Sequence, residues 1–384
     1  MARRIRLPAV LRDEPQFRLL FGSQVLSVLG DRVTSVVLPF AVLSVGGGVG
    51  EVALVSAAQF LPFAVLALPA GVWADRLDRK RILIASDLVR LCTQLTAGLL
   101  PATVSALHLQ PANALRGLTF SIGAIAGPVL AGGLVAFGGG PGVALLFDAA
   151  TFVVSVALLL PLRARLVQAV SAAQDPVATT DHFWTSLRQG WSEVRGRPWV
   201  LAFLTGMCVY HAAVLPAVFV VGPVLADQEL DGASSWAVVT AGFGLGCVLG
   251  DLLFLRWRPR RALRVAGLML VGASCQAAFI GSGFGTWGIA GLEVLAGVCV
   301  TGTFTLWETS LQEHVPAHAL SRVSSYDYLA TAGVIPLGNV LVGAAGAAFG
   351  LHASLVAMSV IGIGVAVAVA SMPSVRALPR GVGV

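Results

Sequence analysis

The chain has 384 residues, of which 57% are hydrophobic and only 11% are charged, and its mean hydropathy is +0.85. Soluble domains carry about 25% charged residues, so this composition excludes a soluble globular protein. The net charge of +6 comes from arginines that stand in short clusters between apolar runs. This arrangement favours the cytoplasmic loops of a membrane protein over nucleic-acid binding.

A membrane-spanning helix needs about 20 mostly apolar residues. The sequence predicts an all-α polytopic membrane protein with about eleven transmembrane helices, five in the first half and six in the second. The apolar runs lie, in chain order, near residues 17–45, 51–74, 82–100, 116–138, 142–161, 199–226, 234–256, 262–282, 285–310, 326–350 and 352–372.

Basic residues indicate which loops face the cytoplasm, because arginine and lysine concentrate on that side of a membrane. The turn at 227–233 is acidic. We therefore expect a cytoplasmic N-terminus and a multi-pass protein of the cell membrane, of bacterial inner-membrane type. The basic clusters lie at residues 3–18, 76–81, 163–197, 256–264 and 376–380.

The longest polar segment, 162–198, divides the chain into two halves. We expect a first helical bundle at 1–161, an amphipathic linker of cytoplasmic type at 162–198 and a six-helix bundle at 199–384. Such a linker fits a helix that rests on the membrane surface, and equally an ordinary amphipathic connection. Its apolar residues recur at helical spacing, at Trp184, Leu187, Trp191 and Val194.

The two halves carry matching landmarks, as the repeats of many transporters do. Arg76, Lys80 and Arg81 recur at the same spacing as Arg256, Arg260 and Arg261, and the segment 100–104 resembles 311–315. Between these landmarks the first half is shorter by about 31 residues, roughly one span and its turn. We therefore expect helix four to be missing from the first bundle.

A missing span conflicts with the sidedness of the loops. With five spans the basic linker at 162–198 would fall outside, whereas a full set of spans would keep it inside. Two resolutions remain open: the later helices are inverted, or one of the earlier runs does not cross the membrane.

The loop between the second and third runs, 71–81, is short and basic. It resembles the signature loop between helices two and three of major facilitator superfamily transporters, with Asp78 where that family usually has glycine. The resemblance implies a latch that holds one conformation of two helical bundles, and a simple topology signal is the alternative. The residues of this motif are Gly71, Asp75, Arg76, Arg79, Lys80 and Arg81.

Ionisable residues within predicted spans are expensive and usually functional, and three of them are candidate site residues. Asp31 stands mid-way along the first run, and Asp87 and Arg90 stand one turn apart on the third. Each is a candidate for proton coupling or substrate binding. Structural pairing, of Asp31 with a nearby arginine or of Asp87 with Arg90, is the alternative.

A glycine and proline pattern lies on the run at 116–138, which carries no charge after Arg116. Small residues at four-residue spacing permit tight helix packing, and a proline bends the helix. The pattern resembles the antiporter motif on helix five of facilitator exporters, and packing alone explains it equally well. Its residues are Gly123, Gly127, Pro128 and Gly132.

Further segments extend the resemblance almost end to end. The segments 22–24, 147–150, 306–316 and 322–327 resemble proton-coupled multidrug exporters, the subfamily that includes macrolide and enterobactin efflux proteins. This implies a two-bundle facilitator fold that exports hydrophobic or amphipathic small molecules, drug-like or siderophore-like, by proton antiport. The alternative is a shortened, transport-inactive membrane protein derived from such an exporter.

Other patterns point to no enzyme, cofactor or metal site. The glycines of 242–246 lie within a span rather than after a strand, which excludes a nucleotide site. Pro316 spoils the helical spacing of His314 and His318 that a metal would use. We expect small molecules, protons and the lipid bilayer as the partners of a monomer, and no nucleic acid.

Overall fold

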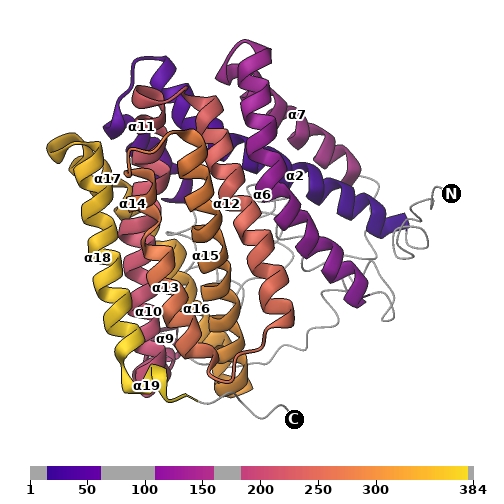
Figure 1. The fold of residues 1–384 in the computed structure, drawn as a ribbon. Helices are drawn as coiled ribbons and strands as arrows, with labels where there is room; N and C mark the ends of the chain where they lie inside the picture. The colour runs from indigo at the N-terminus through magenta and orange to yellow at the C-terminus, as the bar shows by residue number, and fades with distance from the viewer. Residues whose placement is uncertain (1–14, 62–108, 160–182, 379–384) are drawn as a thin grey trace. The chain divides into compact units, whose positions relative to one another are not determined.

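The computed structural model describes residues 15–61, 109–159 and 183–378 (Figure 1). Regular elements in these residues are helical, and seven helices are long and apolar enough to cross a membrane. The prediction of an all-α polytopic membrane protein is confirmed. The total of eleven spans and the absence of helix four stay predictions, because the segment 62–108 lies outside the described residues.

The described residues divide into two compact units, one from residues 15–37 and 109–159 and the other from 38–61 and 183–378. The first unit holds most of α2 (Pro15–Ser44) together with α6 (Leu109–Gly138) and α7 (Pro141–Leu159). A two-glycine turn joins α6 to α7. Both glycines have positive φ, which glycine adopts without steric penalty.

The helix α6 begins earlier than the apolar run that predicts it. It starts at Leu109, whereas the run starts near residue 116. The intervening residues are rich in alanine and leucine, which are strong helix formers, so the helix continues beyond the apolar run. By contrast, α7 matches the predicted run at 142–161 closely.

The second unit contains the other described helices, and six of the seven candidate spans lie in it, between Pro198 and Ser371. Their positions match the predicted runs of the second half. An unlabelled helix at Val49–Leu61 also belongs to this unit. The remaining elements are α9 (Phe183–Arg195), α10 (Pro198–Val209), the π-helices η2 (Tyr210–Val214) and η3 (Ala217–Val221), α11 (Gly222–Glu229), α12 (Ala233–Arg256), α13 (Ala262–Ser274), α14 (Gln276–Ile280), α15 (Thr286–His314), α16 (Ala317–Thr331), the short 3-10 helix η4 (Ala332–Val334), α17 (Ile335–Phe349), α18 (Leu351–Ser371) and α19 (Pro373–Arg376).

Within the second unit α12 runs along α15, and α13 packs against both α15 and α18 (Figure 1). The crossing of α12 and α15 is close because glycines face backbone. A Cβ atom on Gly242 would lie 3.1 Å from the carbonyl carbon of Ala290, and one on Gly246 would lie 2.8 Å from that of Val294. Membrane helices associate through such small residues, because lipid offers no hydrophobic drive for helix pairing.

Buried aromatic residues join α10, α15 and α16. Trp307 of α15 is fully buried and stacks on Phe203 of α10, with ring centroids 4.5 Å apart. Its indole Nε1 donates a hydrogen bond of 3.0 Å to Oδ1 of Asp327 on α16. The exporter-like segments 306–316 and 322–327 are therefore in direct contact.

The second half of the polar linker forms α9, which packs against α16 and α10. Val194 is fully buried, whereas Trp191 is 46% exposed and its ring centroid lies 5.8 Å from that of Tyr326. The amphipathic pattern thus corresponds to a helix with one face on the bundle. The boundaries 1–161, 162–198 and 199–384 stay a prediction.

Three polar contacts of His352, which we call the clasp, join α18 to the last residue of α11 and to the residue that follows α14. The ring Nε2 of His352 lies 2.8 Å and 3.0 Å from the two carboxylate oxygens of Glu229. Its Nδ1 lies 3.1 Å from the carbonyl oxygen of Gly281. All the partners are acceptors, so the clasp is complete only when both ring nitrogens carry a proton.

Candidate functional site

The first candidate site is an acidic cluster in the first unit, formed by Asp31 and Arg32 of α2 with Asp148 and Thr151 of α7. The two helices approach each other at Gly30, where a Cβ atom would collide with Asp148 Oδ1 and Thr151 Oγ1. The hydroxyl of Thr151 donates a 2.7 Å hydrogen bond to the backbone oxygen of Asp148. Glycine at position 30 is therefore what lets the polar side chains of α7 reach α2.

The charges of the acidic cluster are not balanced. Asp148 repels the carboxylate of Asp31, and Arg32 attracts it. Asp31 and Arg32 are exposed, whereas Oδ1 of Asp148 is buried and has no hydrogen-bond partner among the described residues. Two carboxylates near one guanidinium can exchange a proton or bind a cationic group.

The glycine and proline pattern of α6 packs directly beside this cluster. A Cβ atom on Gly123 would lie 3.0 Å from Cγ1 of Val28, and one on Gly127 would lie 3.2 Å from the carbonyl carbon of Arg32. Pro128 is buried and Gly132 is half-buried. The structure thus brings the predicted antiporter motif onto the helix of Asp31.

A second polar contact joins α2 and α7. The hydroxyl groups of Ser23 and Ser155 are 2.7 Å apart and both residues are buried. Beside them, Nε2 of Gln24 is buried without a hydrogen-bond partner among the described residues. The polar face of α2 therefore extends from Ser23 to the acidic cluster.

The other predicted site residues lie outside the described residues. These are the latch residues Gly71, Asp75, Arg76, Arg79, Lys80 and Arg81, and the pair Asp87 and Arg90. Their roles stay predictions.

The second candidate site, the Glu293 cluster, consists of Tyr210, Gln276 and Glu293 in the second unit. The hydroxyl of Tyr210 donates to Oε1 of Gln276 at 2.9 Å, and Nε2 of Gln276 donates to Oε2 of Glu293 at 2.8 Å. The three residues are 2%, 0% and 1% exposed, respectively. Sequence reasoning missed this cluster, although an acidic residue within the apolar run 285–310 was a usable signal.

Two of the three residues stand where a span departs from a regular α-helix. Tyr210 begins the π-helix η2, and Gln276 follows the break at Cys275 between α13 and α14. Ser359 of α18 satisfies the backbone at this break: it donates to the oxygen of Ser274 at 2.8 Å and accepts from the nitrogen of Ala278 at 2.7 Å. Side chains of neighbouring helices commonly satisfy the backbone groups that a broken span leaves free.

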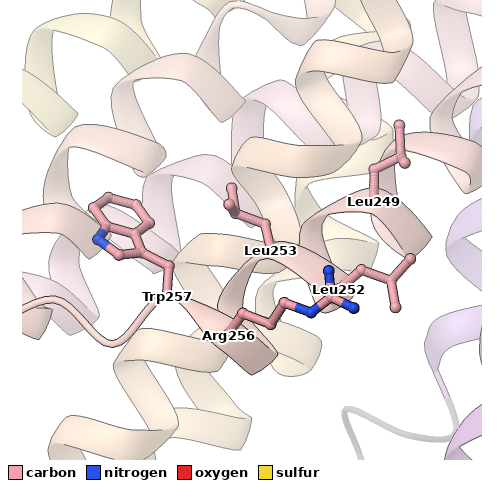
Figure 2. Close-up of a pocket in the computed structure, with 5 residues that line it drawn as sticks. All are labelled: Leu249, Leu252, Leu253, Arg256 and Trp257. Carbon is pink, nitrogen blue, oxygen red and sulfur yellow. The ribbon is translucent and has the colours of Figure 1, made fainter.

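A groove lies at the end of α12. Figure 2 shows its five lining residues, all contributed by the last turns of α12 and the residue that follows. They are Leu249, Leu252, Leu253, Arg256 and Trp257. No group of three or more metal-ligating side chains occurs among the described residues.

Comparisons with known proteins agree with this architecture. A family model described as Major Facilitator Superfamily matches residues 92–338. A second model, described as transmembrane secretion effector, matches residues 9–123. The enterobactin exporter EntS of Escherichia coli is 24% identical over an alignment 386 positions long, gaps included, which covers 88% of this chain and 87% of the exporter.

Solved structures share the fold at low sequence identity. The nucleoside transporter NupG has a TM-score of 0.66 and 12% identity, over 91% of this chain and 98% of that one. A bacterial homologue of the iron transporter ferroportin, in an inward-facing state, has a TM-score of 0.59 and 18% identity, over 94% of this chain and 99% of that one.

Proposed function

The chain belongs to the major facilitator superfamily of transporters, and from this premise we propose that it exports hydrophobic or amphipathic small molecules in exchange for protons. The similarity to an enterobactin exporter along most of the chain supports the direction of transport and a drug-like or siderophore-like substrate. The export would proceed by alternating access across the plasma membrane, with the N-terminus in the cytoplasm and the protein acting as a monomer.

The acidic cluster of α2 and α7 is the observation that supports proton coupling. Asp31 lies in a span, is repelled by Asp148 and is attracted by Arg32. Binding a proton to Asp31 removes the repulsion, and binding a cationic or polar substrate group competes with that proton. A site in which proton and substrate exclude each other is what antiport requires.

The latch loop at 71–81 and the pair Asp87 and Arg90 complete the proposal. The loop would hold one of the two access states, and the pair would assist coupling on the third span. The glycines of α6 would keep that helix close to the Asp31 helix. None of these roles requires a cofactor.

The test is transport by the purified protein in liposomes with an imposed pH gradient. We expect uptake of one or more members of a panel of hydrophobic dyes, macrolides and catecholate siderophores, and its collapse with a protonophore. Asp31→Asn should lower proton-driven transport about tenfold or more, a barrier increase of about 1.4 kcal/mol. The control Asp231→Asn changes an exposed residue outside the spans and should transport normally.

The alternative function is a shortened membrane protein that no longer transports. The deficit of about 31 residues, roughly one span, in the first half favours it. The alternative is supported if stably inserted wild-type protein moves no member of the substrate panel, with or without a pH gradient. That result would refute the proposed export function.

A further inference from the structure

Glu293 is a buried acid that has no balancing charge among the described residues. It lies about two turns into α15 and is 1% exposed. Its Oε2 accepts one hydrogen bond, from Gln276. Among the described residues its buried Oε1 has no hydrogen-bond partner, and Glu293 forms no ion pair.

This environment favours the neutral acid in the conformation described. Burying an ionised carboxylate without a cation costs several kcal/mol, so such a group binds a proton instead. One neutral hydrogen bond from an amide does not offset that cost. A carboxyl group in this setting is suited to hold a proton until water reaches it.

The other two members of the Glu293 cluster, Tyr210 and Gln276, set the hydrogen-bond geometry at Glu293. The hydroxyl of Tyr210 donates to Oε1 of Gln276. This fixes the amide so that its NH₂ group points to Glu293. A carboxylate that forms at Glu293 thus meets a donor that is already oriented.

Other titratable side chains near the Glu293 cluster include one histidine and two cysteines, His211, Cys247 and Cys299. His211 is buried, and its Nδ1 lies 2.8 Å from the backbone oxygen of Met207. Cys247 of α12 and Cys299 of α15 are the remaining electrostatic neighbours of Tyr210. Among these groups, Glu293 is the carboxylic acid, and its side chain is buried.

The Glu293 cluster also lies where two spans depart from a regular α-helix and where α15 closely approaches α12. It joins the start of η2, the break at Cys275 and the helix α15. Residues next to Glu293 on α15, such as Val294, contact glycines of α12 through their backbone. Helix breaks and π-helices often mark functional hinges in membrane proteins.

We propose that Glu293 binds and releases a proton during transport, and that Tyr210 and Gln276 are positioning residues for it. This inference depends on the proposed proton antiport. Binding forms one O–H bond on the carboxylate and removes its charge; release gives the proton to water when a change of conformation hydrates the cluster. The second unit thereby contributes a proton site separate from the acidic cluster of α2 and α7.

The central variant is Glu293→Gln, which keeps the shape of the side chain and imitates the protonated acid. In liposomes it should lose proton-driven accumulation and substrate-evoked proton movement by about tenfold or more. Exchange of labelled for unlabelled substrate without a pH gradient should stay within about twofold of wild type. The matched control is Glu308→Gln, an exposed glutamate on the same helix.

The variant Tyr210→Phe separates positioning from packing. It keeps the aromatic ring but frees the Gln276 amide to rotate away from Glu293. A positioning role predicts a transport pH profile displaced from that of wild type, with substrate exchange unchanged. An unchanged profile would contradict that role.

The outcomes distinguish this inference from the proposed function. If wild-type protein moves substrate without protons, the proposed antiport fails. If wild-type protein moves protons and Glu293→Gln does so equally well, antiport stands and the inference is overturned. A further measurement needs no variant at Glu293: infrared difference spectra should show a protonated-carboxyl C=O band that responds to substrate and persists in Asp31→Asn. The absence of that band would overturn the inference even if Glu293→Gln failed to fold.

Discussion

Replacing Gly297 with alanine should separate α12 from α15 and destabilise the second unit. A Cβ atom at this position would lie 2.8 Å from the nitrogen of Cys247 and 2.9 Å from the carbonyl carbon of Gly246, and closer still to the oxygen of Phe243. All three neighbours are backbone atoms of α12 and have no rotamer to change. The added methyl group is accommodated only by moving one helix.

The size of the effect follows from these distances. Carbon atoms pack at about 3.5–4.0 Å, so the helices must separate by roughly 1 Å at this point. Overpacking of this kind costs about 1–3 kcal/mol. Alanine has a higher helix propensity than glycine, which stabilises the helix by about 1 kcal/mol. We expect a net loss of about 0–2 kcal/mol for Gly297→Ala.

The matched control is Gly291→Ala on the same helix. A Cβ atom on Gly291 meets nothing within 4 Å, so only the propensity gain of about 1 kcal/mol applies. The difference between the two variants, about 1–3 kcal/mol, is then the packing cost alone. Reversible unfolding in mixed micelles, followed by circular dichroism, measures it. Equal stability of the two variants would refute the close approach of α12 and α15.

Two further predictions concern contacts of the second unit. Trp307→Phe keeps the ring stack but leaves the Asp327 carboxylate without the indole donor. We expect a loss of about 1–3 kcal/mol in the free energy of unfolding, measured in the same assay. The exposed control Trp287→Phe should show no loss. His352→Gln removes an ion pair with Glu229 whose side chains are 44% and 43% exposed, so it should cost only about 0–1 kcal/mol. High salt should shrink that loss, and a salt-independent effect would show that the pair acts through packing instead.

The positions of the spans were readable from the sequence because lipid imposes a local rule. Each crossing must satisfy its backbone internally and bury apolar side chains along its length. The predicted run at 234–256 therefore corresponds to α12, and the run at 352–372 corresponds to α18. The early start of α6 shows the limit of this rule, because hydropathy marks the apolar part of a helix rather than its end.

The candidate site was predictable in part. Asp31 was identifiable as an ionisable residue in a span, and the α6 glycines were identifiable by their spacing. That these features share one place on α2 was not readable. The tertiary structure brings them together through Gly30 and Gly127, where neighbouring helices meet α2.

The Glu293 cluster marks what the sequence alone left undecided. Within this cluster Tyr210 and Gln276 lie 66 residues apart in the chain, and Gln276 lies 17 residues from Glu293. The sequence determined that the chain crosses the membrane many times and where most described crossings lie, since hydropathy is a property of consecutive residues. Only the tertiary structure decided which polar side chains are buried together, because that depends on how each helix is rotated, where it is broken and how closely its neighbour approaches.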